Sequence, residues 1–359
     1  MGDGSREKVR QRVTVPPPPI GPAARALLVL RKFAEKVGRA LVGTVLARGG
    51  IVSSPRRVVP GETYLITRRC YQGTFRLRPC IQTNNIFLYC LAFAAERTGV
   101  VLHAACVMSN HHHLVVTDRH GVLPNFLREL HRLTAKALNA SQGQWENLWA
   151  AEPCNVVRLV TDEDIEDKIA YVAANPVAAG LVKQPEQWPG VLLWGESSQR
   201  VLRPDAYFRE DEDGPCPADL TLRIERPALR DGPPMGMREW KERMTRSVAS
   251  KVAAAHQALR EAGREFLGRA AVLATSFIER ARSYETRFGV IPTFAAKARA
   301  VREGLRRVER HFRARYRKAL EQWRDGWRDV TFPMGTWGMA VWHSVVVDRA
   351  ETRGWGYRA

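Results

Sequence analysis

Three consecutive histidines, His111 to His113, stand at the start of an apolar run that continues through Leu114, Val115 and Val116. Such a run favours a β-strand, in which successive side chains point to opposite faces. His111 and His113 therefore share one face, with Cα atoms roughly 6.5 Å apart, and His112 points to the other. Two imidazoles on one face could share a metal ion. The plainer interpretation is a polar edge strand whose histidines meet solvent.

Tyr171 and Asn175 lie four residues apart in a segment with helical spacing, so both side chains project from one face, one turn apart. If that face packs beside His111 and His113, a metal site with two imidazole nitrogens and one amide oxygen lies next to a phenol. Such ligation, with open positions, suits Mg²⁺ or Mn²⁺ bound together with a phosphate. Attack of the phenol on a phosphodiester would form a phosphotyrosine, from which strands can be rejoined. Taken alone, these residues also fit an aromatic at the core edge and a helix stop before Pro176.

The elements that must position these residues follow from hydrophobic periodicity. The pattern predicts strand, helix, strand, strand, helix, strand and helix over residues 62–69, 83–98, 100–108, 111–117, 123–139, 155–160 and 161–175. The last helix opens with a capping-box pattern at Thr161 to Asp164. The first six elements follow the split-βαβ, ferredoxin-like order. We therefore expect an α+β fold with an antiparallel sheet.

The chain of 359 residues carries 56 Lys+Arg against 37 Asp+Glu, which leaves a formal net charge of +19. A balance of this sign favours a polyanionic partner such as nucleic acid, through phosphate contacts and counterion release. The six cysteines include no C-x-x-C pair, which argues against a disulfide framework or a zinc finger. The sequence contains no run of about 18 apolar residues, which is the length that a membrane-spanning helix needs. Together these features predict a cytoplasmic protein associated with the nucleoid.

Composition shifts predict four regions. Residues 1–58 form a basic, Pro-rich arm that includes a possible amphipathic helix, and residues 59–200 form the compact domain. Residues 201–236 are rich in Pro, Gly and charge and are predicted to be a linker. Residues 237–359 are predicted to be a mainly helical, basic extension, in which one long amphipathic helix includes residues 301–327.

Three groups of basic residues are candidates for phosphate contact. Two arginines end the first strand, a stripe spaced by four residues follows on the helix after the histidines, and a third group lines the long C-terminal helix. The candidates are Arg68, Arg69, Arg128, Arg132, Lys136, Arg306, Arg310, Arg313 and Arg317. The other interpretation of each group is a solvated charged surface.

Two segments carry a resemblance to a known family. Residues 108–114 (MSNHHHL) and 171–182 (YVAANPVAAGLV) resemble the single-tyrosine HUH transposases, above all the branch associated with repetitive extragenic palindromes, and the resemblance covers about residues 58–196. It implies a ferredoxin-like fold, a divalent metal on His111 and His113 with Asn175 completing the site, and Tyr171 as the nucleophile. It also implies a single-stranded DNA substrate with an imperfect hairpin, cut and rejoined through a 5′-phosphotyrosine. His112 stands where the family has a bulky apolar residue.

We therefore expect a metal-dependent DNA transposase or strand-transfer nuclease acting on single-stranded hairpin DNA. The alternative is a catalytically inactive, domesticated DNA-binding regulator with the same fold, and metal-dependent cleavage separates the two. A nucleobase deaminase is disfavoured because His103 to Cys106 (HAAC) lacks the H-x-E motif and no P-C-x-x-C partner follows. A zinc hydrolase is disfavoured because the sequence has no H-E-x-x-H motif. The oligomeric state is left open between monomer and homodimer.

Overall fold

The computed structural model describes residues 55–204, 207–229, 235–281 and 292–348. The chain falls into two compact units, one of residues 54–337 and 346–359 and the other of residues 1–53 and 338–345. In the second unit the described residues lie in, or directly after, helix α9 (Trp337–His343).

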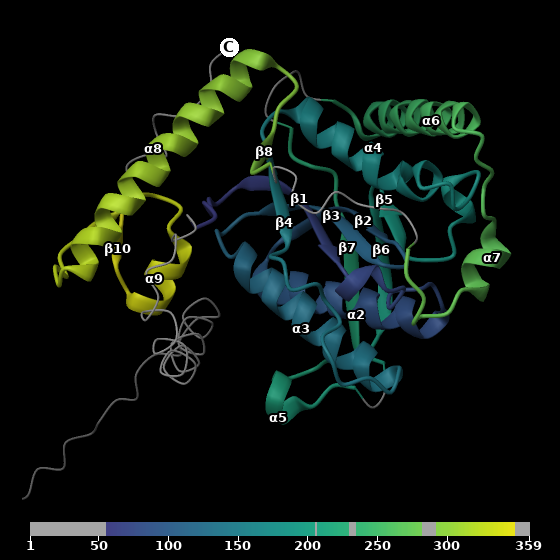
Figure 1. Cartoon of the computed structure of the whole chain (residues 1–359), viewed down its shortest axis with the longest axis horizontal. Helices are drawn as coiled ribbons and strands as arrows, with labels where there is room; N and C mark the ends of the chain where they lie inside the picture. Colours follow the sequence, from purple (N-terminus) through teal and green to yellow (C-terminus); the bar gives the residue numbers. More distant parts are fainter. Residues whose placement is uncertain (1–54, 205–206, 230–234, 282–291, 349–359) are drawn as a thin grey trace, which may run out of the picture. The chain divides into compact units, whose positions relative to one another are not determined.

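A six-stranded sheet forms the centre of the larger unit (Figure 1). Its strands, in spatial order, are β5 (Leu192–Trp194), β2 (Val101–Val107), β3 (His111–Asp118), β1 (Glu62–Arg69), β4 (Asn155–Leu159) and β8 (Phe294–Ala295). The first five run antiparallel to their neighbours, and β8 pairs parallel with β4. The register places Thr67 of β1 opposite His113 of β3, and Arg69 opposite His111. The histidine strand is therefore central in the sheet.

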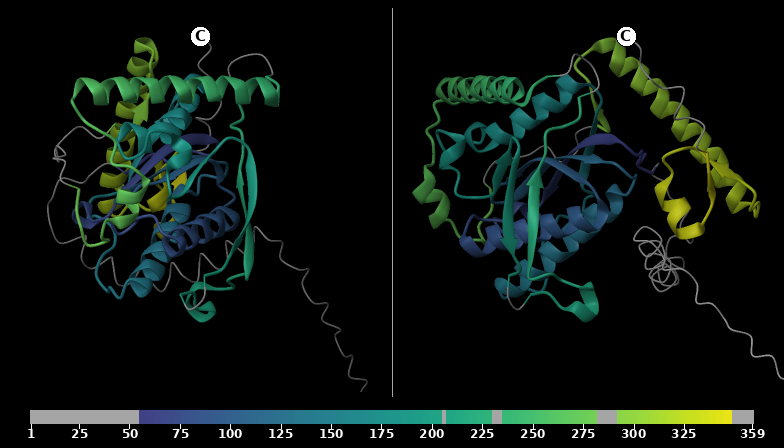
Figure 2. Two further views of the ribbon diagram at one scale, coloured as in Figure 1. Left: turned by 90° about the vertical axis from the view of Figure 1, so that its right-hand side faces the viewer. Right: turned by 180° about the vertical axis from the view of Figure 1, so that it is seen from behind.

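Helices cover both faces of this sheet (Figures 1 and 2). They are α2 (Ile81–Thr98) and α3 (Leu123–Ser141) on one face, and α4 (Asp162–Ala178) with α6 (Met237–Glu261) outside it on the other. Because side chains alternate along a strand, β3 contributes to two cores. Leu114 packs with α2 and α3, whereas Val115 packs with α4. His111 and His113 lie on the same face as Val115, toward α4.

Local sequence signals explain where these helices begin and end. Helix α4 opens with the predicted capping box, in which the Thr161 side chain accepts from the Asp164 backbone N–H and Asp164 reaches back to Thr161. Helix α2 ends at Gly99, whose φ of 69° is a left-handed conformation that glycine adopts without steric cost. The predicted stop of α4 at Asn175 is wrong by three residues, since Pro176 lies inside the last turn. Full burial of Val177 in the core holds that turn together.

The expected α+β class is confirmed, but the sheet is mixed and not purely antiparallel. The parallel strand β8 comes from residues 294–295, far along the chain from β4, and no local periodicity marks so short a strand. A hairpin that was not predicted, formed by β6 (Ser197–Leu202) and β7 (Asp219–Ile224), packs on α2. Residues 219–224 lie within the predicted linker, and their side chains alternate between exposed and buried.

The described residues of the C-terminal part lie mainly in helices. Besides α6, its helices include α7 (Arg269–Ala274) and the long α8 (Arg299–Arg324). The short strands β9 (Thr331–Phe332) and β10 (Val346–Val347) pair with each other. A further short helix, α5 (Glu210–Asp213), precedes this part of the chain. The observed α8 agrees closely with the helix predicted over residues 301–327. The N-terminal arm, apart from residues 55–58, lies outside the described residues, and the four predicted regions stay a prediction. Among the described helices, none combines the length and apolarity needed to cross a membrane.

Candidate active site

His111 and His113 face each other at the start of β3. Their Nε2 atoms are 3.0 Å apart, and their ring centroids are separated by 4.7 Å. The other ring nitrogen of each is held by a neighbour: Nδ1 of His111 lies 2.6 Å from Asn110 Oδ1, and Nδ1 of His113 lies 2.8 Å from Thr67 Oγ1. Because an amide oxygen can only accept, His111 carries its proton on Nδ1 and presents a bare Nε2. The pair thus points its Nε2 atoms at one common place.

Both imidazoles are neutral at physiological pH. Burial, aided by the charge of Arg69, lowers the pKa of His111 to about 4. Burial, followed by the proximity of His111, also lowers the pKa of His113 well below its usual value. A neutral imidazole is the form that binds a metal ion. The environment therefore keeps both rings ready for ligation.

Tyr171 contacts the histidine pair from α4. Its ring meets that of His113 edge to face, with centroids 5.4 Å apart. Burial raises the pKa of the Tyr171 phenol, and a side-chain hydrogen bond with Asn175 acts in the opposite direction. Asn175 itself is 8% exposed and lies one turn further along α4. The structure thus brings together the phenol and the imidazoles that the sequence analysis singled out, and it places the predicted third ligand beside the phenol.

Lys168 is a neighbour of Tyr171 that the sequence analysis missed. Its Nζ lies 5.7 Å from the centroid of the Tyr171 ring and 2.9 Å from Oδ2 of Asp167. Asp167 is also bound by Lys251 at 2.9 Å and by Lys297 at 3.6 Å. Burial alone would raise the pKa of Asp167, but hydrogen bonds from Lys251 and Lys168 lower it to about 2. Lys297 also pairs with Glu163 at 3.0 Å, so three ammonium groups face two carboxylates and a net positive charge remains around Asp167.

A cation beside a phenol favours its ionised form, so Lys168→Met should slow any reaction in which Tyr171 loses its proton. We expect formation of a covalent DNA adduct to fall about 10- to 100-fold at neutral pH, and its pH profile to move to higher pH. DNA affinity should change little. Lys251→Met is the matched control, since it removes the same charge from Asp167 at a lysine on α6. Equal rates for the two variants would contradict this role for Lys168.

The donor set fits a divalent metal. Two ligands about 2.1 Å from one ion and at right angles are about 3.0 Å apart, which is the Nε2 separation of His111 and His113. Thr67 and Asn110 hold the distal nitrogens, as second partners of metal-bound histidines commonly do. Asn155 lies opposite Thr67 in the register, and its buried Oδ1 has no hydrogen-bond partner among the described residues. No group of three His, Cys, Asp or Glu side chains there could hold a metal, so further ligands would have to be amides, water or substrate.

His112 points away from this site, as alternation predicts. It is fully buried on the opposite face, where its Nε2 lies 3.0 Å from Nε2 of His131. Its ring packs against Phe87 and Trp149. His112 therefore fills the core position that a bulky apolar side chain would occupy, and it does not contact the candidate metal site formed by His111 and His113.

Residues of the predicted basic stripe on α3 form ion pairs within the protein. Arg132 and Lys136 both bind the carboxylate of Asp213, whose side chain is completely buried. Arg128 lies 3.4 Å from Glu129. Arg68 donates to the carbonyl oxygens of Ala150 and Glu152, at 3.1 Å each, and these carbonyls belong to the segment that follows α3. DNA contact by these residues stays a prediction, but each already has a protein partner.

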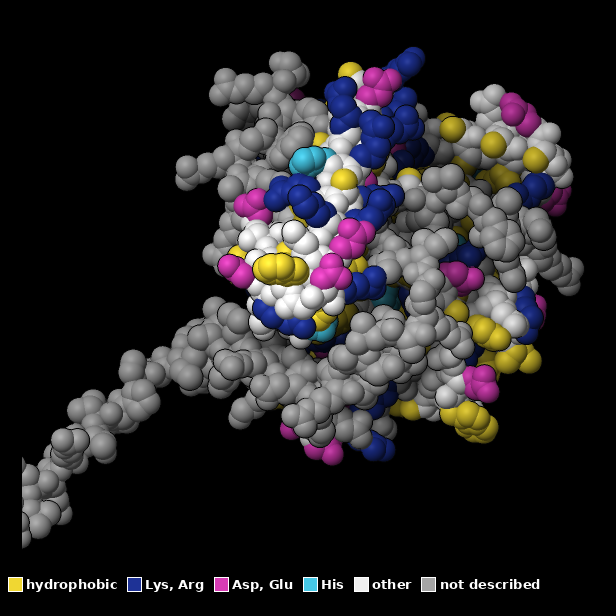
Figure 3. Space-filling model, turned by 60° about the vertical axis from the view of Figure 1, so that its left-hand side comes forward, with side chains coloured by type: hydrophobic (Ala, Val, Ile, Leu, Met, Phe, Trp, Pro, Cys, Tyr) yellow, Lys and Arg dark blue, Asp and Glu magenta, His cyan; other side chains and the backbone are white. Residues whose placement is uncertain are grey.

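The basic residues of α8 are more exposed to solvent than those of α3. The exposed side chains include those of Arg306, Arg310, Arg313 and Arg317, and Figure 3 shows Lys and Arg gathered along this helix. Arg313 lies 3.2 Å from Glu309. The helix buries its other side through residues such as Leu305 and Phe312. The amphipathic pattern of α8 therefore presents a positively charged surface.

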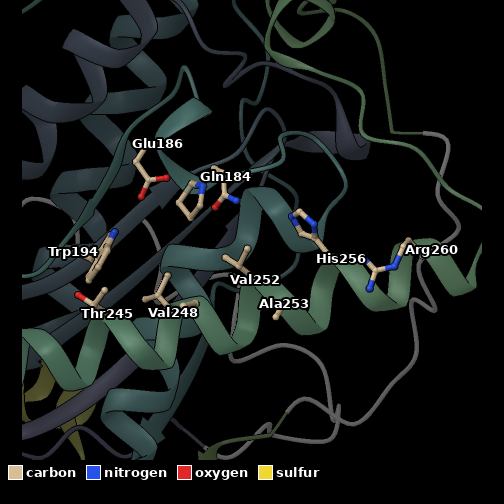
Figure 4. Close-up of a pocket in the computed structure, with 11 residues that line it drawn as sticks. Gln184, Glu186, Trp194, Thr245, Val248, Val252, Ala253, His256 and Arg260 are labelled. Atoms are coloured by element: carbon tan, nitrogen blue, oxygen red, sulfur yellow. The ribbon is translucent and has the colours of Figure 1, made fainter.

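A pocket of about 490 Å³ lies away from the histidine pair, between α6 and residues 184–194 (Figure 4). Trp194, Val248 and Val252 line it with apolar surface, and His256 and Arg260 lie toward one end. Neither of the paired histidines nor Tyr171 contributes to its lining. It is therefore distinct from the candidate active site.

Comparisons with known proteins give limited matches. No family model matches the sequence, and no curated protein does. A solved structure described as a REP-associated tyrosine transposase bound to a REP hairpin is 18% identical, with a TM-score of 0.33, and the match covers 39% of this chain and 81% of that one. A putative transposase from Deinococcus radiodurans R1 is 21% identical, with a TM-score of 0.23, covering 35% of this chain and 97% of that one.

Proposed function

We propose that the protein is a DNA strand-transfer enzyme of the transposase type, with a ferredoxin-like HUH core, that acts on single-stranded DNA carrying hairpins. The observation that carries the proposal is the contact of the Tyr171 ring with His113, whose Nε2 is paired with that of His111. The ferredoxin-like part of the proposal is supported by the spatial order β2-β3-β1-β4, antiparallel throughout, with α2 and α3 on one face.

In the proposed reaction the Tyr171 hydroxyl oxygen attacks a phosphodiester of the bound strand. The bond from phosphorus to the 3′ oxygen breaks, leaving a 5′-phosphotyrosine and a free 3′ hydroxyl that takes up the equivalent of the phenol proton. Since burial raises the pKa of Tyr171, loss of this proton needs help, which the charge of Lys168 supplies in part. Asn175 orients the hydroxyl through its hydrogen bond.

His111 and His113, with Asn175 as the predicted third ligand, would hold Mg²⁺ or Mn²⁺. When bound, such an ion withdraws charge from the non-bridging phosphate oxygens. Thr67 and Asn110 keep the two imidazoles oriented toward it. Attack on the phosphotyrosine by another 3′ hydroxyl reverses the first step, so the same residues could rejoin strands.

The direct test is to incubate the purified protein with end-labelled hairpin oligonucleotides and Mg²⁺, Mn²⁺ or EDTA, and to separate the products on a denaturing gel. We expect a covalent protein–DNA species that requires the divalent ion and retains a 3′-end label, whereas a 5′-end label leaves on the released fragment that carries the free 3′ hydroxyl. Tight DNA binding without any covalent species under all metal conditions would instead support the inactive DNA-binding regulator.

Exposed arginines of α8 are proposed to contact DNA phosphates. Replacing Arg306, Arg310 and Arg317 together with alanine should weaken binding and lower the slope of log affinity against log salt by about two to three units, because each lost phosphate contact removes just under one. Arg313 is left in place, since it pairs with Glu309. The control removes three exposed cations from α6, namely Lys241, Arg246 and Arg260. Equal slopes for the two triple variants would exclude phosphate contact by α8.

A further inference from the structure

The segment after α3 exposes a large aromatic side chain. Trp145 is 89% exposed, whereas Trp149, four residues later, is 8% exposed and donates from Nε1 to the carbonyl oxygen of His131. The Asn139 side chain binds the carbonyl oxygen of Glu146 at 2.8 Å. Before Trp145, the backbone N–H of Gln144 donates to the carbonyl oxygen of Asn139 at 2.8 Å. The segment is therefore anchored on both sides of the exposed indole.

A hollow of about 350 Å³ adjoins this tryptophan. We call it the Trp145 pocket, and its lining includes Arg68, Asn139, Trp145, Glu146, Asn147 and Trp149. The lining combines aromatic surface with hydrogen-bond donors and acceptors. The buried Nε of Arg68 has no hydrogen-bond partner among the described residues, although its terminal nitrogens are bound to backbone carbonyls.

The Trp145 pocket lies at the same end of the sheet as the histidine pair. Backbone N–H groups of Tyr71 and Ala150 bind the carbonyls of Leu148 and Arg69, at 2.9 Å each, so the segment runs beside the end of β1. Arg69 is the register partner of His111. Arg68 is adjacent in sequence to Thr67, the partner of His113, and points to the other face of the sheet. The pocket and the histidine pair therefore flank one edge from opposite faces.

The chemistry of the Trp145 pocket matches a nucleobase. An exposed indole offers a face on which any base can stack, and the edge of a base needs both donors and acceptors, which Arg68, Asn147 and Glu146 can provide. Glu146 makes the pocket unsuited to a phosphate, because two anions would lie together. An unpaired base is thus favoured over the backbone as the group that enters.

We propose that the Trp145 pocket binds an unpaired base of single-stranded DNA next to the phosphodiester that is cut, with Trp145 as the stacking surface. The inference rests on the proposed function for the position of the DNA. A strand that passes the histidine pair reaches this pocket by crossing the end of β1, so the pocket would fix which bond is presented to Tyr171.

The test compares binding of two probes by protein carrying Tyr171→Phe, so that no cleavage is needed. One probe is a hairpin oligonucleotide with a single-stranded flank of mixed sequence that contains aminopurine, and the other is the same hairpin with blunt ends. Trp145→Ala should weaken binding of the flanked hairpin about 10- to 100-fold and abolish the quenching of aminopurine fluorescence. It should leave the blunt hairpin unaffected, and Trp145→Phe should restore most of the affinity.

Trp342→Ala is the matched control, because it removes another exposed tryptophan, on α9, which is 63% exposed. Equal loss of affinity for flanked and blunt hairpins, or no loss for either, would overturn the inference even if the wild-type protein forms the covalent adduct. Conversely, a flank-specific loss in a protein that never forms the adduct would support the base pocket while the proposed cleavage fails. Absence of binding to both probes would refute both proposals.

Discussion

A Tyr171→Phe variant is expected to bind hairpin DNA as the wild-type protein does and to form no covalent adduct with it. Phenylalanine keeps the ring that contacts His113 and lacks the oxygen that would bond to phosphorus. The rate of adduct formation should fall by a factor of about a thousand or more, because the nucleophile itself is lost. The free energy of unfolding should fall only slightly, since only the hydrogen bond with Asn175 disappears. Denaturing gels with labelled oligonucleotides measure the adduct, and thermal melting measures stability.

The control for this variant is Tyr71→Phe. Tyr71 lies two residues after Arg69, the last residue of β1, and is 45% exposed, so it is a more accessible phenol close to the same edge of the sheet. Its replacement should leave the adduct unchanged. If Tyr171→Phe still reacted at the wild-type rate, or if mass spectrometry located the DNA on Tyr71, the nucleophile would have been assigned wrongly.

His113→Ala is expected to abolish stabilisation of the protein by Mn²⁺ as well as adduct formation. A ligand that binds the folded state alone stabilises it by roughly 2.7 kcal/mol at a hundred times its dissociation constant, so the melting temperature of the wild-type protein should rise with Mn²⁺. Removing one of two paired imidazoles should cancel that rise and slow adduct formation about 100-fold or more. The melting temperature without metal shows whether the variant is folded.

The same measurement has a defined pH dependence. The pKa of His111 is lowered to about 4, so protonation competes with the metal only below that region, and stabilisation by Mn²⁺ should persist down to about pH 5. An unperturbed histidine pair would lose it nearer pH 6.5. His120→Ala is the control, because His120 is exposed and lies just after β3. A Mn²⁺ response that survives in His113→Ala but is lost in His120→Ala would place the metal elsewhere.

The order of the core elements could be predicted because its signals are local. Alternation over residues 62–69 and 111–117 and the helical spacing after residue 83 each lie within one element, and the observed strands β1 and β3 and helix α2 agree with them. Alternation also assigned His111 and His113 to one face. What it could not supply is register, so Thr67 as the neighbour of His113 became visible only with the strand pairing.

Contacts between distant segments explain the remaining differences. Lys136 pairs with Asp213, 77 residues further on, so no pattern around Lys136 could show that this charge is already used. The strand Asp219–Ile224 does alternate, with Leu220, Leu222 and Ile224 buried, but the Pro- and Gly-rich residues on both sides favoured a linker. Lys168 could have been found, since it lies one turn before Tyr171 and shares its side of the helix.

The packing of His112 has a consequence for how this site could be re-engineered. Its ring lies against Trp149, and His131 contacts both, so one aromatic stack connects the strand of the metal-binding pair to the segment that presents Trp145. Grafting a different recognition segment onto this scaffold would therefore require transplanting Trp149 together with His131. A graft that ignored them should loosen the strand that carries the paired imidazoles and so impair the proposed cleavage.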